Sequence, residues 1–134
     1  MYTTDRKPEG VLLVTVIEAK KLAKKDFISK NDPYVELWLE DDSRQTTRVI
    51  DNTNNPLWNS QFTFPIEENR PRNKVHFRVF DQDYIGKDLI GEASVEFEQV
   101  ADAPSMDVWI TLRNRKNEKK SQGELHVGLE FRAS

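Results

Sequence analysis

The sequence predicts an all-β protein, an eight-stranded antiparallel β-sandwich. Apolar residues recur at every second position in many short segments, and turn-forming residues separate these segments at regular intervals. The only segment that suggests a helical turn covers residues 96–102. Strands that alternate between apolar and polar residues bury one face, so two sheets of such strands can pack their apolar faces together.

The eight predicted strands follow one another along the chain. The first shows the pattern most simply, since Leu12, Val14 and Val16 alternate with a second row of residues. Six segments carry this alternation clearly, and they are residues 12–17, 34–40, 58–64, 75–80, 108–113 and 125–132. Two weaker segments complete the set, residues 44–50 and 90–97. Turn-rich stretches separate the strands, and they are residues 51–56, 69–73, 103–105 and 114–123.

Composition indicates a small globular protein and excludes several functional classes. The 134 residues suffice for one domain with a sizeable core, and 37% of them are hydrophobic. A net charge of −3 does not indicate nucleic-acid binding. The absence of cysteine excludes disulfides, cysteine catalysis and cysteine-ligated zinc, and it is compatible with a cytoplasmic protein. The longest apolar run, residues 11–17, is too short to span a bilayer, so we expect any membrane contact to be peripheral.

Five aspartates lie in two segments that the strand pattern leaves as loops. Asp26 and Asp32 bracket one loop, while Asp81 and Asp83 follow a predicted strand and Asp88 precedes the next one. Two carboxylates about 5 Å apart repel each other by roughly 3 kcal/mol at an effective dielectric near 20. Each aspartate alone is explained as a turn residue, but all five together favour a hard divalent cation. An oxygen-only set points to calcium, with room for about two ions.

The segment around Asp81 also matches part of the EF-hand calcium loop, but the match fails. Four residues fall on positions of that loop formula, namely Asp81, Asp83, Gly86 and Glu92. Another ligand position is taken by Ile85, which has no ligand atom, and the flanking segments alternate as strands rather than helices. We therefore expect the calcium site on a different scaffold.

Five linked motifs make the chain resemble the C2 domain family. In chain order they are GVLLVTVIEAKKL, NDPYVELWL, TNNPLWNSQFTF, VHFRVFDQD and DLIGEASV. The resemblance covers residues 10–132, which leaves residues 1–9 as an N-terminal extension and residues 133–134 as a C-terminal tail. It implies a Greek-key sandwich. Of the two strand orders in the family, the chain is similar to the type II topology, because the AKKL strand comes first and GELHVGLEF supplies the last strand.

The resemblance also implies ligands and a function. The five calcium-binding aspartates of the family match Asp26, Asp32, Asp81, Asp83 and Asp88. The third loop is about one residue shorter than in many relatives. Family members also contribute backbone carbonyls at the positions of Lys25 and Gln82. Since domains of this kind dock on phospholipid, often through calcium, we expect calcium-dependent binding of anionic membranes that contain lipids such as phosphatidylserine.

Strand direction predicts which loops share one end of the sandwich. If consecutive strands reverse direction, every loop after an odd-numbered strand lies at the same end. Both aspartate loops, residues 51–56 and the basic residues 113–120 then lie together. Bound calcium would convert this end from repelling to attracting anionic lipid. Apolar and basic side chains in the loops are the candidates for lipid contact, and they are Phe27, Ile28, Tyr84, Ile85, Lys24, Lys30, Lys87, Arg115 and Lys116.

Two other functional classes compete with membrane docking. A calcium-independent protein-interaction scaffold would use the same sandwich through a sheet face or a loop, and a protein partner is also compatible with lipid docking. An enzyme is not expected, because His76 and His126 each lie one position off the core face of a strand and no catalytic motif accompanies them. A basic groove at Arg44 and Arg48 is weakened by acidic residues such as Glu36 on the neighbouring strand. We expect a cytoplasmic monomer that moves to membranes when calcium rises.

Overall fold

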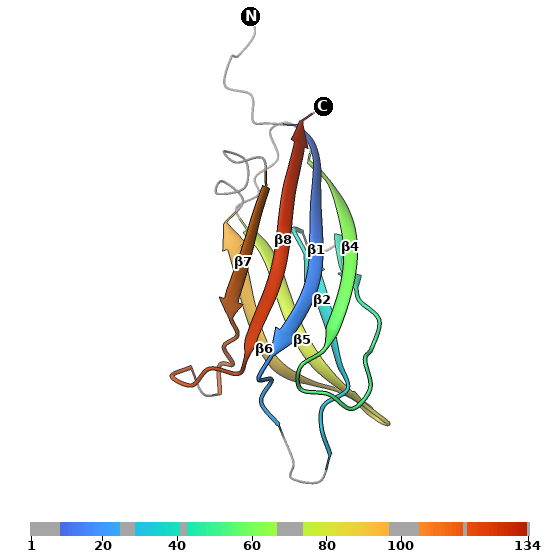
Figure 1. The fold of residues 1–134 in the computed structure, drawn as a ribbon, viewed down its shortest axis with the longest axis vertical. Coiled ribbons are helices and arrows are strands. Elements are labelled where there is room, and N and C mark those ends of the chain that lie inside the picture. The colour runs from blue at the N-terminus through green and yellow to red at the C-terminus, as the bar shows by residue number, and fades with distance from the viewer. Residues whose placement is uncertain are drawn as a thin grey trace, which may run out of the picture.

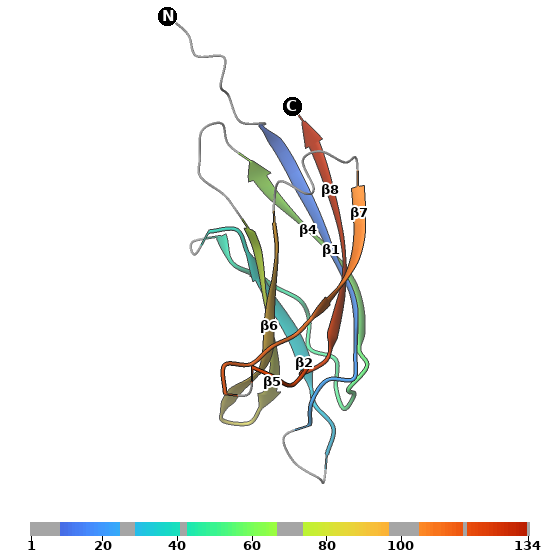
Figure 2. The same ribbon diagram turned by 90° about the vertical axis from the view of Figure 1, so that its left-hand side faces the viewer.

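The structure, a computed structural model, describes residues 9–24, 29–40, 43–66, 74–96, 105–116 and 118–133. Its strands form two four-stranded antiparallel sheets that face each other (Figures 1 and 2). The strands are β1 (Gly10–Lys20), β2 (Pro33–Trp38), β3 (Gln45–Thr46), β4 (Leu57–Ile66), β5 (Lys74–Asp83), β6 (Gly86–Glu96), β7 (Ser105–Thr111) and β8 (Glu124–Ala133). The predicted eight-stranded sandwich is confirmed. In this part of the chain, no helix is long and apolar enough to cross a membrane.

The place of the last strand identifies the topology. One sheet has the strand order β4-β1-β8-β7 and the other the order β3-β2-β5-β6. β8 therefore lies between β1 and β7 and pairs antiparallel with both. The last strand thus fills an interior place in the sheet, between the first strand and β7, as the type II order requires, which confirms the expected strand order.

One hydrophobic core fills the space between the sheets. Alternate residues of the longer strands point into it, as in β1, where Leu12, Val14 and Val16 are fully buried. Burial of a side chain of this size contributes on the order of 1.5–3 kcal/mol. Trp58 of β4 is also buried, and its indole Nε1 donates a hydrogen bond to the carbonyl of Arg48 at 3.1 Å, so its polar atom is satisfied. The alternation that predicted the strands is thus the one that builds the core.

The predicted strand at residues 44–50 and the predicted helical turn at residues 96–102 have different outcomes. The predicted strand at residues 44–50 was wrong in length, because only the two residues of β3 form a strand there. Thr47 explains why β3 ends early. The N–H of Val35 on β2 donates to Oγ1 of Thr47 at 2.9 Å, so this N–H is bonded to a side chain instead of to a backbone carbonyl of a longer β3. Apart from Glu96, which ends β6, the predicted helical turn at residues 96–102 lies outside the described residues.

The connections that follow β1, β3, β5 and β7 all lie at one end of the sandwich, at the bottom of Figures 1 and 2. This end, named the loop end below, was predicted from strand reversal and is confirmed. Backbone hydrogen bonds join three of these connections. The N–H of Leu22 donates to the carbonyl of Asn54 at 3.1 Å, and the N–H of Ala23 donates to the carbonyl of Gln122 at 3.0 Å. Segments distant in sequence are therefore held side by side.

Candidate metal site at the loop end

A cavity of about 710 Å³ opens at the loop end, and its charged lining is mostly acidic. Four of the five predicted aspartates line it, together with residues from three connections. The lining is Ser29, Lys30, Asp32, Val49, Asp51, Asp81, Gln82, Asp83, Tyr84 and Asp88. Four other predicted site residues lie outside the described residues, namely Lys25, Asp26, Phe27 and Ile28.

Asp32 and Asp81 are held together by the pairing of β2 with β5. The residue after Asp32, Pro33, lies opposite Asp81 in the ladder. The N–H of Asp32 donates to Oδ1 of Asp81 at 2.8 Å, and the N–H of Gln82 donates to the carbonyl of Asp32 at 3.0 Å. The two carboxylates are thus attached to the ends of paired strands, which places them on a rigid support.

Asp83 and Asp88 lie on a hairpin where the sequence predicted an open loop. β5 continues to Asp83 and β6 begins at Gly86, so Asp81 lies directly opposite Asp88. The Asp83 side chain stabilises the turn, since its Oδ1 accepts a hydrogen bond from the N–H of Ile85 at 3.0 Å. The alternation of apolar residues ends before this hairpin. Periodicity alone therefore could not show that the strands continue.

The hairpin brings like charges together. Carboxylates directly opposite each other destabilise a strand pair. Burial raises the pKa of the Asp81 carboxyl above its ordinary value, and the charges of Asp32, Asp88 and Asp83 raise it further, against a hydrogen bond from the Asp32 amide that lowers it. The charged form of Asp81 is therefore disfavoured here. A bound cation would have the opposite effect, because it stabilises ionised carboxylates.

Asp51 is an acidic lining residue that the sequence analysis missed. It lies in the middle of the β3–β4 connection, next to Asn52, whose backbone is left-handed with a φ of 56°. The N–H of Asn52 donates to Oδ1 of Asp32 at 2.6 Å, which ties this connection to the predicted ligands. The sequence did contain a signal for Asp51. It is the first residue of the turn-rich stretch 51–56, and that stretch was expected at the same end as the aspartate loops.

The buried Asn31, which precedes Asp32, is fixed by hydrogen bonds to Asn54 and Ala23, and this arrangement was also missed from the sequence. Asn31 is 2% exposed, and its Nδ2 donates to the carbonyl of Ala23 at 3.0 Å and to Oδ1 of Asn54 at 2.8 Å. The backbone N–H of Asn31 donates to the same Asn54 oxygen at 3.1 Å. Since buried polar groups are costly without partners, these bonds hold the β1–β2 and β3–β4 connections in one arrangement. The only sign of this contact in the sequence was the presence of asparagines in the motifs NDPY and TNNP.

Several predicted lipid-contact residues are exposed at the loop end. Tyr84 and Ile85 form the turn of the β5–β6 hairpin and are fully exposed, at 107% and 98%. Lys24, Lys30 and Lys116 are exposed as well, and Lys30 lines the cavity. Tyr84 and Ile85 are adjacent, so they form one exposed apolar patch, and a contiguous patch of this kind is a candidate contact surface.

The other predicted basic residues contact the outer surface of the second sheet. Lys87 Nζ lies 3.8 Å from Glu36 and 4.3 Å from the centre of the Phe80 ring. Arg115 Nε lies 3.8 Å from Glu92. Arg44 also pairs with Glu36, at 2.6 Å, so acidic partners offset the basic groove that this strand suggested.

The chemistry of the cavity fits calcium. Calcium accepts six to eight oxygen ligands in irregular geometry, and this lining offers carboxylates and carbonyls without nitrogen or sulfur ligands. Among the residues that the structure describes, no three acidic or histidine side chains are already gathered closely enough to enclose an ion.

Fold and cavity together define a class of protein: a type II antiparallel sandwich with aspartates from separate connections at one end. The model of the C2 domain family matches residues 10–112, and the chain belongs to this family.

Known relatives agree with this assignment. Synaptotagmin-4 of Arabidopsis thaliana is 36% identical over 129 residues, which cover 89% of this chain and 22% of that protein. The calcium-dependent lipid-binding protein of the same plant is 37% identical over 130 residues, which cover 93% of this chain and 25% of that protein. A solved C2 domain of plant Extended Synaptotagmin 1 has a TM-score of 0.82 at 26% identity, covering 96% of this chain and 98% of that one. The chain thus spans about a quarter of the curated relatives that it matches.

Proposed function

We propose that this C2 domain is a peripheral module that binds anionic phospholipid membranes when calcium occupies the loop end. The observation that carries the proposal is the convergence of four aspartates on one cavity, beside the fully exposed Tyr84 and Ile85. The name of one relative, a calcium-dependent lipid-binding protein, supports the same function. No catalytic step is part of this proposal.

The cavity supplies the ligands for about two calcium ions. The proposed ligands are the carboxylates of Asp32, Asp81, Asp83 and Asp88 and the carbonyl of Gln82, completed by Asp26 and the carbonyl of Lys25. Calcium, when bound, supplies positive charge and open coordination positions for lipid phosphate or carboxylate oxygens. The carboxylates keep the loop end negative in its absence and so repel anionic lipid.

The apolar residues of the hairpin supply a second contribution. Tyr84 and Ile85 have no contact to lose when they enter the head-group region, because both are fully exposed. Each would contribute on the order of 1–3 kcal/mol when buried there. We propose the same role for Phe27 and Ile28 in the β1–β2 connection.

Basic residues add a nonspecific attraction to anionic lipid. Lys24, Lys30 and Lys116 are exposed at the loop end, and each can contribute up to about 1 kcal/mol near an anionic surface. Lys87 and Arg115 contribute less, because acidic partners already hold them. A monomeric domain with these properties would reside in the cytoplasm and move to phosphatidylserine-containing membranes when calcium rises.

Vesicle sedimentation tests the proposal. Vesicles of phosphatidylcholine and phosphatidylserine should pellet the protein in millimolar calcium and release it in chelator. Asp81→Asn removes one ligand charge and should raise the vesicle concentration for half-maximal pelleting by about tenfold, which is 1.4 kcal/mol. The control is Glu96→Gln, an exposed acid at the far end of β6, which should pellet like the unmodified protein. Pelleting that ignores calcium, or that Asp81→Asn leaves unchanged, would refute the proposal.

A further inference from the structure

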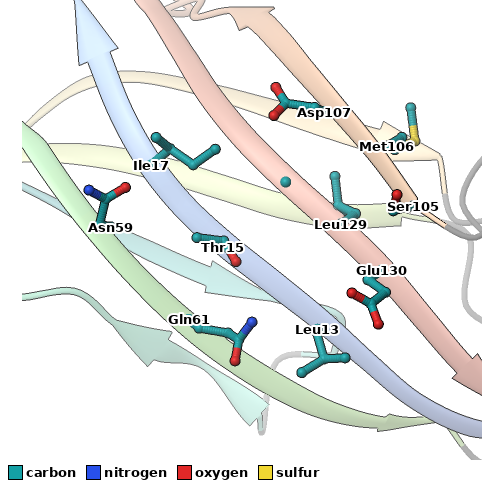
Figure 3. Close-up of a pocket in the computed structure, with 11 residues that line it drawn as sticks. Leu13, Thr15, Ile17, Asn59, Gln61, Ser105, Met106, Asp107, Leu129 and Glu130 are labelled. Carbon is teal, nitrogen blue, oxygen red and sulfur yellow. The ribbon is translucent and has the colours of Figure 1, made fainter.

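A groove of about 560 Å³ crosses the outer face of the β4-β1-β8-β7 sheet, away from the loop end. Figure 3 shows the side chains that line it, from all four strands. His126 and Trp109 face each other across β8 and β7 and lie between the groove and the loop end. β8 starts at the loop end and β7 finishes there, so His126 comes before the groove residues of β8 and Trp109 comes after those of β7. The groove is therefore a different surface from the proposed calcium site.

The groove exists because residue 128 has no side chain. In the ladder, Gly128 lies between Thr15 of β1 and Asp107 of β7, so one row across the sheet has a gap at its centre. A Cβ added at Gly128 would meet Ile17, Thr15 and Met106 at 3.8–4.0 Å, which are ordinary contacts. Its backbone is not left-handed either, since positive φ among the glycines described occurs at Gly86 and Gly123. Packing does not require glycine here, yet its presence keeps the groove open.

The two sides of the groove differ in chemistry. Its floor is apolar, with Leu13 and Ile17 of β1, while Met106 of β7 contributes its backbone, since its side chain packs against the core. The β7 and β8 side carries Asp107 and Glu130, whose side chains are 68% and 42% exposed. The β4 side carries two neutral amides, Asn59 and Gln61.

Both carboxylates can accept further hydrogen bonds. Asp107 contacts Nε2 of His126, and Glu130 accepts from Nε of Arg132 at 2.6 Å. A carboxylate has about four acceptor positions, so one neighbour on each leaves capacity for a ligand cation. The rim of the groove is therefore an acceptor for ammonium or guanidinium groups.

We propose that this groove binds a polypeptide segment of a partner protein. The segment inserts an apolar side chain over Gly128 and places a neighbouring lysine or arginine against Asp107 and Glu130. Charge complementarity selects this occupant, because the charged lining of the groove is acidic throughout. This inference does not depend on calcium or on membrane binding.

The same charges disfavour two other occupants. Anionic phospholipid would be repelled by Asp107 and Glu130. A second copy of this chain, docked symmetrically through the same face, would bring these two carboxylates against their own equivalents. A basic and apolar peptide meets neither obstacle.

Selection from a phage-displayed library of random dodecapeptides, on immobilised protein in chelator, tests the proposal. Selected peptides should share a lysine or arginine close to an aliphatic or aromatic residue. Gly128→Met fills the groove and should weaken binding of the selected peptides at least tenfold. Thr111→Met adds the same side chain on the exposed face of β7 outside the groove, and it should change binding less than twofold. Glu130→Gln should weaken binding several-fold in low salt and less in 1 M salt.

Melting curves and calcium-dependent vesicle pelleting of Gly128→Met should match those of the unmodified protein, which separates this test from that of the proposed function. If Gly128→Met does not fold, the salt-dependent loss in Glu130→Gln decides the question. The proposal is wrong if no selected peptide depends on Gly128 or Glu130. It is also wrong if Gly128→Met instead reduces vesicle pelleting, which indicates a lipid occupant, or abolishes self-association in sedimentation velocity, which indicates a second copy.

Discussion

Carboxylates gather at two places on this sandwich, and the two places differ in what balances their charge. On the outer face of the first sheet, Glu18 and Asp107 both contact the ring of His126, with Glu18 Oε2 3.0 Å from Nδ1. At the loop end, Asp81 lies opposite Asp88 in the β5–β6 ladder. Its Oδ1 accepts a backbone N–H from Asp32, which does not cancel the surrounding negative charge.

The pKa shifts show the consequence of this difference. Burial alone would lower the pKa of His126, but the hydrogen bonds and charges of Glu18 and Asp107 outweigh it and raise that pKa above 6.5. At the loop end, burial and neighbouring carboxylates raise the pKa of Asp81, so its charge is destabilised. One cluster has a basic ring between its carboxylates, whereas the charged neighbours that shift the pKa of Asp81 at the loop end are all carboxylates.

The largest effect that this comparison predicts is calcium stabilisation of the loop end. A ligand that binds only the folded state at a hundredfold excess over its Kd adds about 2.7 kcal/mol. For a chain of this size each kcal/mol raises Tm by about 3 °C, so calcium at this excess should raise Tm by about 8 °C. Melting curves in calcium and in chelator measure the difference.

Substitutions should show how much each aspartate contributes to the rise in Tm that calcium causes. Asp81→Asn should remove most of the rise in Tm, and Asp51→Asn should remove a smaller part, since Asp51 lines the cavity from a third connection. Glu96→Gln should leave it intact. An unchanged Tm for the unmodified protein at millimolar calcium would mean that the loop end does not require a cation.

The same two clusters show how far sequence reasoning reaches. Alternation predicted the strands, and strand reversal predicted that the aspartate loops share an end, because both follow from backbone geometry alone. The acidic partners of His126 were not predicted. They lie on β1 and β7, and only the pairing of β8 with both strands brings Glu18 and Asp107 to the same ring.

Side-chain direction limited the prediction of the lipid contacts in the same way. Lys87 was proposed to contact lipid because it is a basic residue in the segment predicted to be an aspartate loop. In the structure, the β5–β6 hairpin extends through this segment and Lys87 reaches Glu36 on β2. That contact depends on the pairing of three strands, which no local pattern encodes. The exposure of Tyr84 and Ile85 was easier to predict, because a turn at the tip of a hairpin has no neighbouring strand.

A smaller effect on the stability of the fold is expected at His126. Its dependence on pH is opposite to that of an acid group whose pKa is lowered on folding. Because its pKa is raised in the folded state, the protonated ring stabilises the fold below its ordinary pKa of about 6.5. This stabilisation is lost as the pH rises through the higher folded pKa. His126→Gln should therefore lower Tm by a few degrees near pH 6, about 1 kcal/mol for a partly exposed cluster, and by less near pH 9.

Melting curves between pH 5.5 and 9 measure this effect. Part of the loss should not depend on pH, since the ring of His126 also stacks on Trp109 with centroids 4.4 Å apart. Asp107→Asn should reduce only the part that depends on pH. A difference in Tm between the unmodified protein and His126→Gln that widens with rising pH would contradict the ion-pair interpretation.

The smallest predicted effect compares two lysines near the loop end. Lys30 lines the cavity, while Lys87 is engaged by Glu36 and the Phe80 ring. Lys30→Ala should weaken calcium-dependent vesicle binding by about fivefold, or about 1 kcal/mol, and Lys87→Ala should weaken it less than twofold. Both effects should fade in high salt, because they are electrostatic. Equal losses would mean that Lys87 leaves Glu36 at the membrane, and Glu36→Gln should then strengthen vesicle binding by freeing it.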